Sequence, residues 1–283
     1  MPKNKTGICA LCNTKNVTLT EEHIFPGAKR NRCNNLPFEA TLFNDAISTP
    51  IVEGQSTMNL KELKKKGLVR HKQGGQSVYS LCKKCNNNTG SWYGNAYIDW
   101  KNQWDQIRKS YLNQNSKSIK GKITFNPLRF LKQIVSCFIS VDYLNHSGNP
   151  SIEDNLRNIQ PEFFDFVLDP QKRYNFNNLR IFVHLLWDNN GQGHYTGHIM
   201  AHDLVKKKDL YPYTLNLIDG YIQYSLLFDT NSPYEPKHFG RQILDISKYS
   251  MYTDRQTTKF LRLEEIEWIF KIRAVPETKQ NHP

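Results

Sequence analysis

Four cysteines in this chain have the spacing of metal ligands. Cys9 and Cys12 form one Cys-x-x-Cys pair, and Cys82 and Cys85 form a second. Two intervening residues let the chain turn so that both sulfurs of a pair reach one ion, and four thiolates suit a closed tetrahedral zinc site. One pair alone could be a redox motif, but two pairs in one polar, basic region predict structural zinc.

Three further residues with catalytic chemistry accompany the cysteines. Glu22 and His23 lie between the two pairs and precede Ile-Phe-Pro, and Asn86 directly follows the second pair. A neutral imidazole can accept a proton from water near neutral pH. A carboxylate and an amide oxygen are ligands that Mg²⁺ accepts while it keeps most of its waters. These residue types therefore predict a hydrolytic metal site beside the zinc.

Together, Cys-x-x-Cys, Glu-His-Ile-Phe-Pro and Leu-Cys-x-x-Cys-Asn-x-x-x-Gly resemble the HNH endonucleases, the zinc-stapled ββα-metal nucleases. The resemblance covers roughly residues 8–100. It implies that His23 is the general base and that Glu22 and Asn86 hold a catalytic Mg²⁺ or Mn²⁺. It also implies hydrolysis of DNA phosphodiester bonds, with a role in restriction or anti-phage defence by analogy.

The resemblance leaves the group that orients His23 open. An Asn commonly stands a few residues before the second cysteine pair in this family, where this chain has Gln-Ser-Val-Tyr. Asn34, Asn35 or a backbone carbonyl is the remaining choice. A function of a different class also stays open, namely a non-catalytic zinc-dependent module that binds nucleic acid and carries Glu22-His23 as a surface pair.

Positive charge is concentrated in the part of the chain that carries the cysteines. Residues 1–125 contain 20 Lys+Arg and 8 Asp+Glu, a difference of +12, whereas residues 126–283 contain 18 of each. Charge that served only solubility would have no reason to segregate, so the excess predicts contact with a polyanion, double-stranded DNA first and RNA as the alternative. The basic residues predicted to contact nucleic acid are Lys29, Arg30, Arg32, Lys64, Lys65, Lys66, Lys83 and Lys84.

The patterning predicts an α+β fold in two domains. Residues 1–112 are predicted to form the zinc-stapled nuclease domain, with the ββα-metal fold that the resemblance implies and a long helix. Residues 113–126 are predicted to be a linker or an edge strand. Residues 127–283 are predicted to form a mixed α/β domain with an antiparallel sheet, for regulation, for specificity, or for contact with a regulatory protein or a second copy of the chain.

Local periodicity assigns the individual elements. The expected elements are a knuckle and strand or hairpin over 8–26, a strand over 77–81, a helix from Asn86–Asn88, a helix from Pro127, a strand over 180–187, a hairpin of 213–218 with 221–228, and a closing helix over 263–272. The first helix carries an apolar stripe at helical spacing that favours a core face over a base-stacking surface. The stripe consists of Tyr93, Tyr97, Trp100, Trp104, Ile107 and Tyr111.

Other features of the sequence concern the cellular compartment. No apolar run reaches the roughly 18 residues of a membrane helix, and Met-Pro-Lys-Asn-Lys lacks the apolar segment of a signal peptide, which favours a cytoplasmic protein.

Cys137 lies in an apolar helical pattern and is expected to be a core thiol, whereas Cys33 is ambiguous. Four histidines could form a second metal site, but no carboxylate or cysteine pattern joins them, which favours ordinary structural roles. They are His184, His194, His198 and His202.

Overall fold

The computed structural model describes residues 5–26, 77–111, 118–145, 156–176, 179–185, 214–219, 221–228 and 244–264. This part of the chain is mixed α+β, and all of its paired strands are antiparallel. The elements are β1 (Lys5–Gly7), β2 (Val17–His23), β3 (Ser77–Cys82), α3 (Lys83–Lys109), β4 (Ser118–Phe125), α4 (Pro127–Asn145), α5 (Leu156–Ile159), α6 (Glu162–Leu168), β5 (Leu179–Leu185), β6 (Thr214–Asp219), β7 (Ile222–Phe228), β8 (Leu244–Asp245), the 3₁₀ helix η2 (Ser247–Met251) and β9 (Thr257–Glu264).

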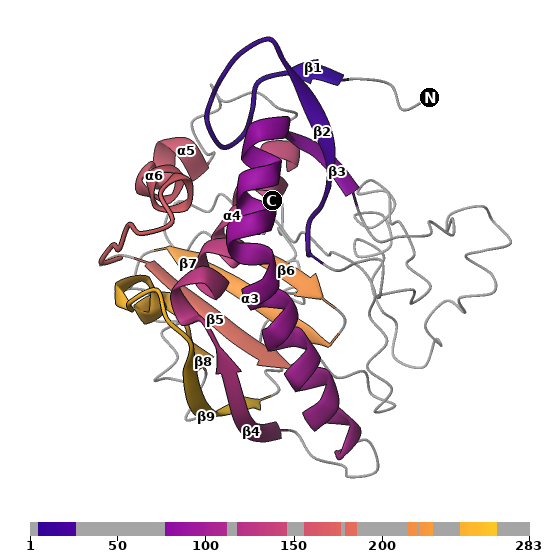
Figure 1. Cartoon of the computed structure of the whole chain (residues 1–283), viewed down its shortest axis with the longest axis vertical. Helices are drawn as coiled ribbons and strands as arrows, with labels where there is room; N and C mark the ends of the chain where they lie inside the picture. The colour runs from indigo at the N-terminus through magenta and orange to yellow at the C-terminus, as the bar shows by residue number, and fades with distance from the viewer. Residues whose placement is uncertain are drawn as a thin grey trace, which may run out of the picture.

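The first sheet has the order β1-β2-β3 and leads straight into α3. The predicted strand over 77–81 is confirmed as β3, and β2 pairs with it from Leu19 opposite Cys82 to His23 opposite Ser77. Helix α3 begins at Lys83, earlier than the predicted start at Asn86–Asn88, because extended backbone at Cys82 already caps it. The second cysteine pair therefore spans the junction of strand and helix, and α3 continues down the length of the molecule (Figure 1).

The aromatic stripe of α3 is confirmed as a core face. Tyr93, Tyr97, Trp100 and Trp104 are fully buried, and the remaining two members, Ile107 and Tyr111, pack against the same core. The Trp100 ring lies 4.4 Å from the ring of Phe130 on α4, measured between centroids. Aromatic pairs at such distances add stabilisation beyond the burial of their area. The stripe is thus occupied by intramolecular packing.

Helix α4 is buried on nearly every side, including its polar positions. Its apolar residues, such as Leu128, Leu131 and Phe138, are buried, and Lys132 is fully buried with them. Its Nζ donates to the backbone carbonyls of Phe166 and Asp169 and lies 4.1 Å from the centroid of the Phe166 ring. Burial lowers the pKa of Lys132 to about 8, because removal from water disfavours the charged amine.

Two more sheets complete the described fold. One has the order β6-β7-β5-β8, and the antiparallel pairing of β6 with β7 confirms the predicted hairpin, with Asp219 opposite Ile222. The other is a two-stranded ribbon of β4 and β9, which pair over their whole length. The closing helix predicted from Leu263 is wrong for its first two residues, because Leu263 and Glu264 end β9. The rest of that prediction lies outside the described residues.

Segments from both predicted domains meet in one cluster of buried side chains. The ring of Phe25 lies 5.3 Å from that of Tyr97 on α3 and 5.9 Å from that of Tyr224 on β7, measured between centroids. Cys137 is buried here as expected, and its thiol donates to the carbonyl of Ile24. Among the described helices, none combines the length and the apolar character needed to cross a membrane.

An ion pair between α4 and the loop before β9 gives a first prediction. Arg129 Nε and Nη2 donate to the two carboxylate oxygens of Asp254 at 2.6 and 2.7 Å. The hydrogen bonds from Arg129 lower the pKa of Asp254 to about 2. Because the folded-state pKa is depressed, this stabilisation is present above about pH 4 and is lost as the pH falls towards 2. Asp254→Asn should cost about 1–2 kcal/mol at pH 7, a figure limited by the partial exposure of Arg129.

Urea unfolding of the wild type and of Asp254→Asn between pH 7 and pH 2 measures this effect. The exposed carboxylate of Asp99 on α3 provides a control, Asp99→Asn, for which we expect a change within about 0.5 kcal/mol. A cost for Asp254→Asn that stayed constant down to pH 2 would contradict the assignment of the stabilisation to the ionised carboxylate.

Candidate functional site

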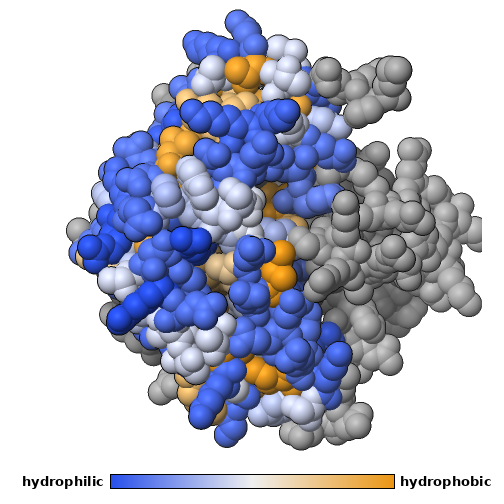
Figure 2. Space-filling model, in the orientation of Figure 1, coloured by the Kyte–Doolittle hydropathy of each residue, from blue (hydrophilic) through white to orange (hydrophobic). Residues whose placement is uncertain are grey.

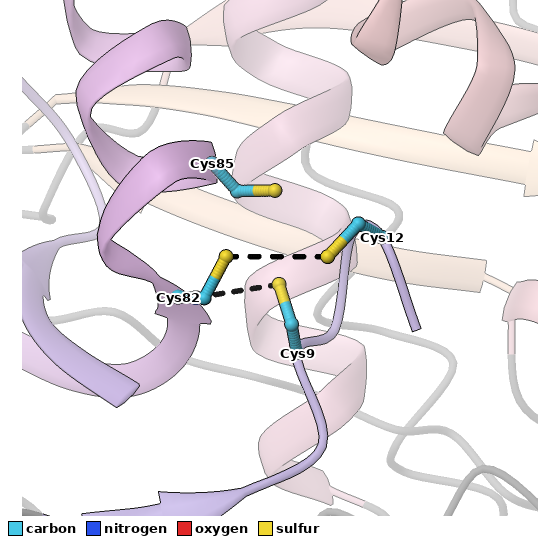
Figure 3. A group of neighbouring side chains, drawn as sticks. All are labelled: Cys9, Cys12, Cys82 and Cys85. Atoms are coloured by element: carbon cyan, nitrogen blue, oxygen red, sulfur yellow. Dashed lines mark hydrogen bonds between the residues drawn. The ribbon is translucent and has the colours of Figure 1, made fainter. Parts of the chain in front are cut away.

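The first cysteine pair lies on a tight loop between β1 and β2. The amide of Asn13 donates to the carbonyl of Cys9 at 2.9 Å, and the amide of Cys9 donates to the carbonyl of Thr14 at 2.9 Å. Asn13 and Asn16 have φ values of 58° and 56°, a left-handed conformation that asparagine tolerates better than most residues. These turns aim the sulfurs of Cys9 and Cys12 at the start of α3 (Figure 3).

The second pair comes from the end of β3 and the first turn of α3. Residues three apart on a helical turn share a face, so Cys85 comes back beside Cys82 at the helix start. The four sulfurs converge on one point in Figure 3, and all lie within 4.8 Å of one another. Cys12 Sγ and Cys82 Sγ are 3.9 Å apart. A tetrahedron with four Zn–S bonds of about 2.3 Å has sulfur–sulfur edges of about 3.8 Å, so the cluster fits a zinc ion.

The electrostatics of the cluster also favour a cation. The hydrogen bond from Cys85 lowers the pKa of the Cys9 thiol well below its usual value, which favours the thiolate form of Cys9. The hydrogen bond that Cys85 donates to Cys9 raises the pKa of Cys85, and burial raises that of Cys82. A metal ion that bound these sulfurs would displace the protons of the thiols that it coordinates. The four cysteines form a group that can bind a metal such as zinc.

Groups around the cysteines hold the cluster in shape. The backbone amide of Cys82 donates to Cys9 Sγ at 3.3 Å, as outer-shell donors to metal-bound sulfur do. Arg157 of α5 donates through Nη2 to the carbonyls of Ala10 and Leu11, and its guanidinium stacks 3.8 Å from the centroid of the Phe164 ring. Residues far along the chain therefore fix the loop that carries Cys9 and Cys12.

Glu22 is buried on the helical side of β2. Its side chain accepts a hydrogen bond from the hydroxyl of Ser80 on β3 and another from Ser140 on α4, and the residue is 8% exposed. Burial raises the pKa of Glu22 to about 7, although the two serine hydrogen bonds act in the opposite direction. A carboxylate in this environment binds a proton or a cation more readily than one in water.

His23 and Asn86 lie close to Glu22 along β2 and at the start of α3. His23 is exposed at the end of β2, next in sequence to the buried Glu22. Asn86 Nδ2 donates to Thr20 Oγ1 at 3.0 Å and to the carbonyl of Glu21 at 3.4 Å. Within the described residues, the hydrogen bonds of the Glu22 side chain are with Ser80 and Ser140 and those of Asn86 are with Thr20 and Glu21, so no direct hydrogen bond joins the two predicted cation ligands.

The structure places only part of the remaining predicted site. Lys83 and Lys84 are exposed on the first turn of α3, beside the cysteine cluster. His184 is buried in β5, where its Nε2 lies 3.0 Å from Ser225 Oγ and burial lowers its pKa to about 4. The other predictions lie outside the described residues. These are the contacts at Lys29, Arg30, Arg32, Lys64, Lys65 and Lys66, the orienting residues Asn34 and Asn35, the ambiguous Cys33, and His194, His198 and His202.

Three partners of the site are absent from the sequence-based prediction. Ser140 reaches Glu22 from 118 positions further along the chain (140 − 22), and Thr20 and Ser80 are small hydroxyl residues of a kind that occurs throughout the sequence. Only the alternation of β2 could have suggested that Glu22 faces inward, because strand neighbours point to opposite sides.

Comparisons with protein-family models, with curated proteins and with solved structures give no match for this chain.

Proposed function

We propose that this protein is a metal-dependent HNH-type endonuclease that hydrolyses phosphodiester bonds of DNA. One observation carries the proposal: two antiparallel strands run directly into a helix, with four clustered cysteines at the strand–helix junction and an exposed histidine at the end of the first strand. This is the element order that the family resemblance implies. The cysteine frame fixes β2, β3 and the start of α3 relative to one another, and these elements carry His23, Glu22 and Asn86.

In this function, His23 is the general base. Its imidazole accepts a proton from the water that attacks phosphorus, while the P–O3′ bond breaks and the leaving oxygen takes up a proton from solvent. The exposure of His23 supports this role, because both water and a polyanionic substrate can reach it. A buried histidine such as His184, whose pKa is lowered to about 4, has no such access.

Glu22 and Asn86 are the proposed ligands of one Mg²⁺ or Mn²⁺. The hydrogen bonds of the Asn86 side chain to Thr20 and Glu21 use Nδ2, which leaves Oδ1 as the atom that would bind a cation. When bound, the cation would neutralise charge on the scissile phosphate and on the leaving oxygen. To bind the cation, the Glu22 carboxylate must be ionised. It must also either keep its hydrogen bonds to Ser80 and Ser140 while it binds the cation or give them up.

The charge distribution supports DNA as the substrate. The excess of +12 lies in residues 1–125, which contain 20 Lys+Arg against 8 Asp+Glu. Lys83 and Lys84 add exposed positive charge at the start of α3. Double-stranded DNA is the proposed substrate, with RNA as the alternative, and restriction or anti-phage defence in the cytoplasm is the proposed setting. Residues 127–283 would serve regulation, specificity, or contact with a regulatory protein or a second copy.

One observation favours a second candidate, a non-catalytic zinc-dependent module that binds nucleic acid. The Glu22 carboxylate is hydrogen bonded to Ser80 and Ser140 rather than directed at Asn86. In this function, Glu22 would be a buried structural group and the cysteine frame would present the basic surface alone. The two candidates differ in cleavage, not in binding.

Cleavage by the wild type separates the two candidates, and Asn86→Ala tests whether Asn86 is a cation ligand of the nuclease. If Asn86 is a cation ligand, the variant should keep one zinc and its melting temperature to within a few degrees, while cleavage of supercoiled plasmid in Mg²⁺ falls by a factor of about 10 or more. Asn87→Ala, at an exposed neighbouring position, is the matched control and should cleave like the wild type. Excess Mn²⁺ should partly rescue Asn86→Ala. Equal cleavage by both variants over a range of Mg²⁺ concentrations would remove Asn86 from the site.

A further inference from the structure

The β4–β9 ribbon has one face against the core and one face in solvent. Ile119, Ile123 and Phe125 of β4 and Leu261 and Leu263 of β9 are buried on the inner side. The alternate residues point outward, as the period of a strand requires. At Gly121 on the inner side, an added Cβ would collide with Cδ1 of Ile107, which shows how closely α3 covers that face. Figure 1 places the ribbon beside the C-terminal half of α3, away from β1–β3.

The register arranges the outward residues in cross-strand rows. Lys120 is opposite Arg262, and Lys122 is opposite Phe260. The next row is Thr124 and Thr258, whose hydroxyls are 2.8 Å apart. Directly opposite side chains on antiparallel strands have Cβ atoms about 5 Å apart, so three cations and one aromatic ring share a small area. We call this set, Lys120, Lys122, Phe260 and Arg262, the ribbon patch.

The charges of the ribbon patch are only partly neutralised. Arg262 Nε is 2.7 Å from Glu264 Oε1, whereas Lys120 and Lys122 have no carboxylate partner among the residues that the structure describes. Like charges directly opposite each other, as at Lys120 and Arg262, destabilise a ribbon. Lysines can protect an exposed strand edge from aggregation, but that role does not require a cationic pair across the strands. An anion bound between the two strands would offset the repulsion.

Phe260 indicates what kind of polyanion fits. It is 66% exposed, more than any other large apolar residue of the described chain, and it lies opposite Lys122 and beside Arg262. An isolated exposed phenylalanine is ordinary, and Met251, at 50%, shows that apolar exposure alone indicates little. An aromatic face flanked by Lys and Arg is the arrangement that stacks unpaired bases while the cations contact phosphates. Bases of an intact duplex are stacked within the helix and cannot use it.

We propose that the ribbon patch binds a single-stranded segment of nucleic acid, with a base stacked on Phe260 and phosphates held by Lys120, Lys122 and Arg262. The patch lies on the ribbon, at a distance along α3 from the cysteine frame (Figure 1). The inference rests on the proposed function only in that nucleic acid is the expected substrate. If the protein is a nuclease, a single strand bound here would place the adjoining duplex or strand for cleavage at His23. If it is a binding module, the single strand would bind without being cleaved.

The test is fluorescence anisotropy with the full chain carrying His23→Ala, so that the probe stays intact. The probes are a labelled single-stranded DNA of about 20 nucleotides, the same sequence as RNA, and the matching duplex. Phe260→Ser should weaken single-strand binding roughly tenfold and change duplex binding less than about twofold. Lys120→Gln with Lys122→Gln should reduce the slope of log K against log salt by about 1.4, or about 0.7 for each phosphate that a lysine no longer neutralises.

Two substitutions on η2 serve as matched controls. Met251→Ser removes another exposed apolar side chain, and Lys248→Gln removes another exposed lysine. Polar and apolar residues intermix on the face of the molecule that Figure 2 shows. Both should leave the affinity for the single strand within about twofold, and all variants should melt within a few degrees of the parent. The proposal is overturned if Phe260→Ser binds like its control, if duplex and single strand weaken equally, or if the parent binds no nucleic acid.

The two proposals can fail separately. Cleavage of plasmid by the chain with His23 intact is measured in a parallel assay. If substitutions in the ribbon patch weaken binding but no cleavage occurs, the ribbon inference stands and the nuclease proposal fails. If the protein cleaves DNA but those substitutions do not change binding, the nuclease proposal stands and the ribbon inference fails. If Lys120→Gln/Lys122→Gln binds DNA and RNA with unchanged affinity but no longer binds an acidic protein partner, the inference is overturned and the patch is assigned to a protein instead.

Discussion

Replacing Cys82 by serine is expected to abolish stoichiometric zinc binding and to unfold the β1–β3 sheet. Cys82 belongs to the strand, the helix cap and the metal cluster at once, so its loss disconnects β3 from the loop that carries Cys9 and Cys12. Structural zinc contributes on the order of 10 kcal/mol to folding in zinc-finger peptides, more than the total stability of many domains. The free thiols left behind would be partly buried without a metal.

Zinc content per chain and far-ultraviolet circular dichroism on heating measure this effect. Cys137→Ser is the matched control, because Cys137 is a buried cysteine that is not part of the cluster. The control should retain one zinc per chain even if the buried hydroxyl costs some stability. Retention of one zinc by Cys82→Ser, or equal zinc loss in both variants, would contradict the four-cysteine site.

His23→Ala is expected to lower the cleavage rate by roughly 10²- to 10⁴-fold, the usual contribution of a general base. His23 is the last residue of β2 and its side chain is exposed. Its replacement should therefore leave packing, zinc content and DNA affinity nearly unchanged. Single-turnover cleavage of a labelled duplex in Mg²⁺ gives the rate without interference from product release. Glu21→Gln, an exposed neighbour on the same strand, should remain within severalfold of the wild type.

A rate loss in His23→Ala that was matched by Glu21→Gln would point to a disturbed strand end instead of a lost base. A loss of affinity with an unchanged rate at saturation would move His23 from catalysis to binding. Only a lowered rate at saturating DNA agrees with proton transfer by His23.

Local patterns in the sequence were sufficient for the features that depend on neighbouring residues. The Cys-x-x-Cys spacing, the helical period of Tyr93 to Trp104 and the pairing of β6 with β7 each depend on residues that are near one another in the sequence. Each of them is present in the structure. The mixed α+β class and the antiparallel strands follow from the same patterns. These features require no knowledge of distant contacts.

Features set by distant contacts were missed. Strand β9 pairs with β4 from far along the chain, and the apolar residues from Leu263 onward also suit a helix, so periodicity predicted the wrong element there. Burial of Lys132 depends on backbone carbonyls supplied by α6 and the loop after it. The inward position of Glu22 depends on Ser140 of α4. Tertiary packing determined the structure in each of these cases, and a short stretch of sequence carries no information about such distant contacts.

Cleavage of supercoiled plasmid by the zinc-loaded full chain in Mg²⁺ decides whether the protein is a nuclease, with wild type and His23→Ala compared at equal DNA binding. A metal-dependent nuclease predicts relaxed or linear plasmid with the wild type and intact plasmid with His23→Ala, although both proteins bind it with the same affinity. Intact plasmid with both proteins at equal binding, in Mg²⁺ and in Mn²⁺, would contradict the nuclease and favour the binding module.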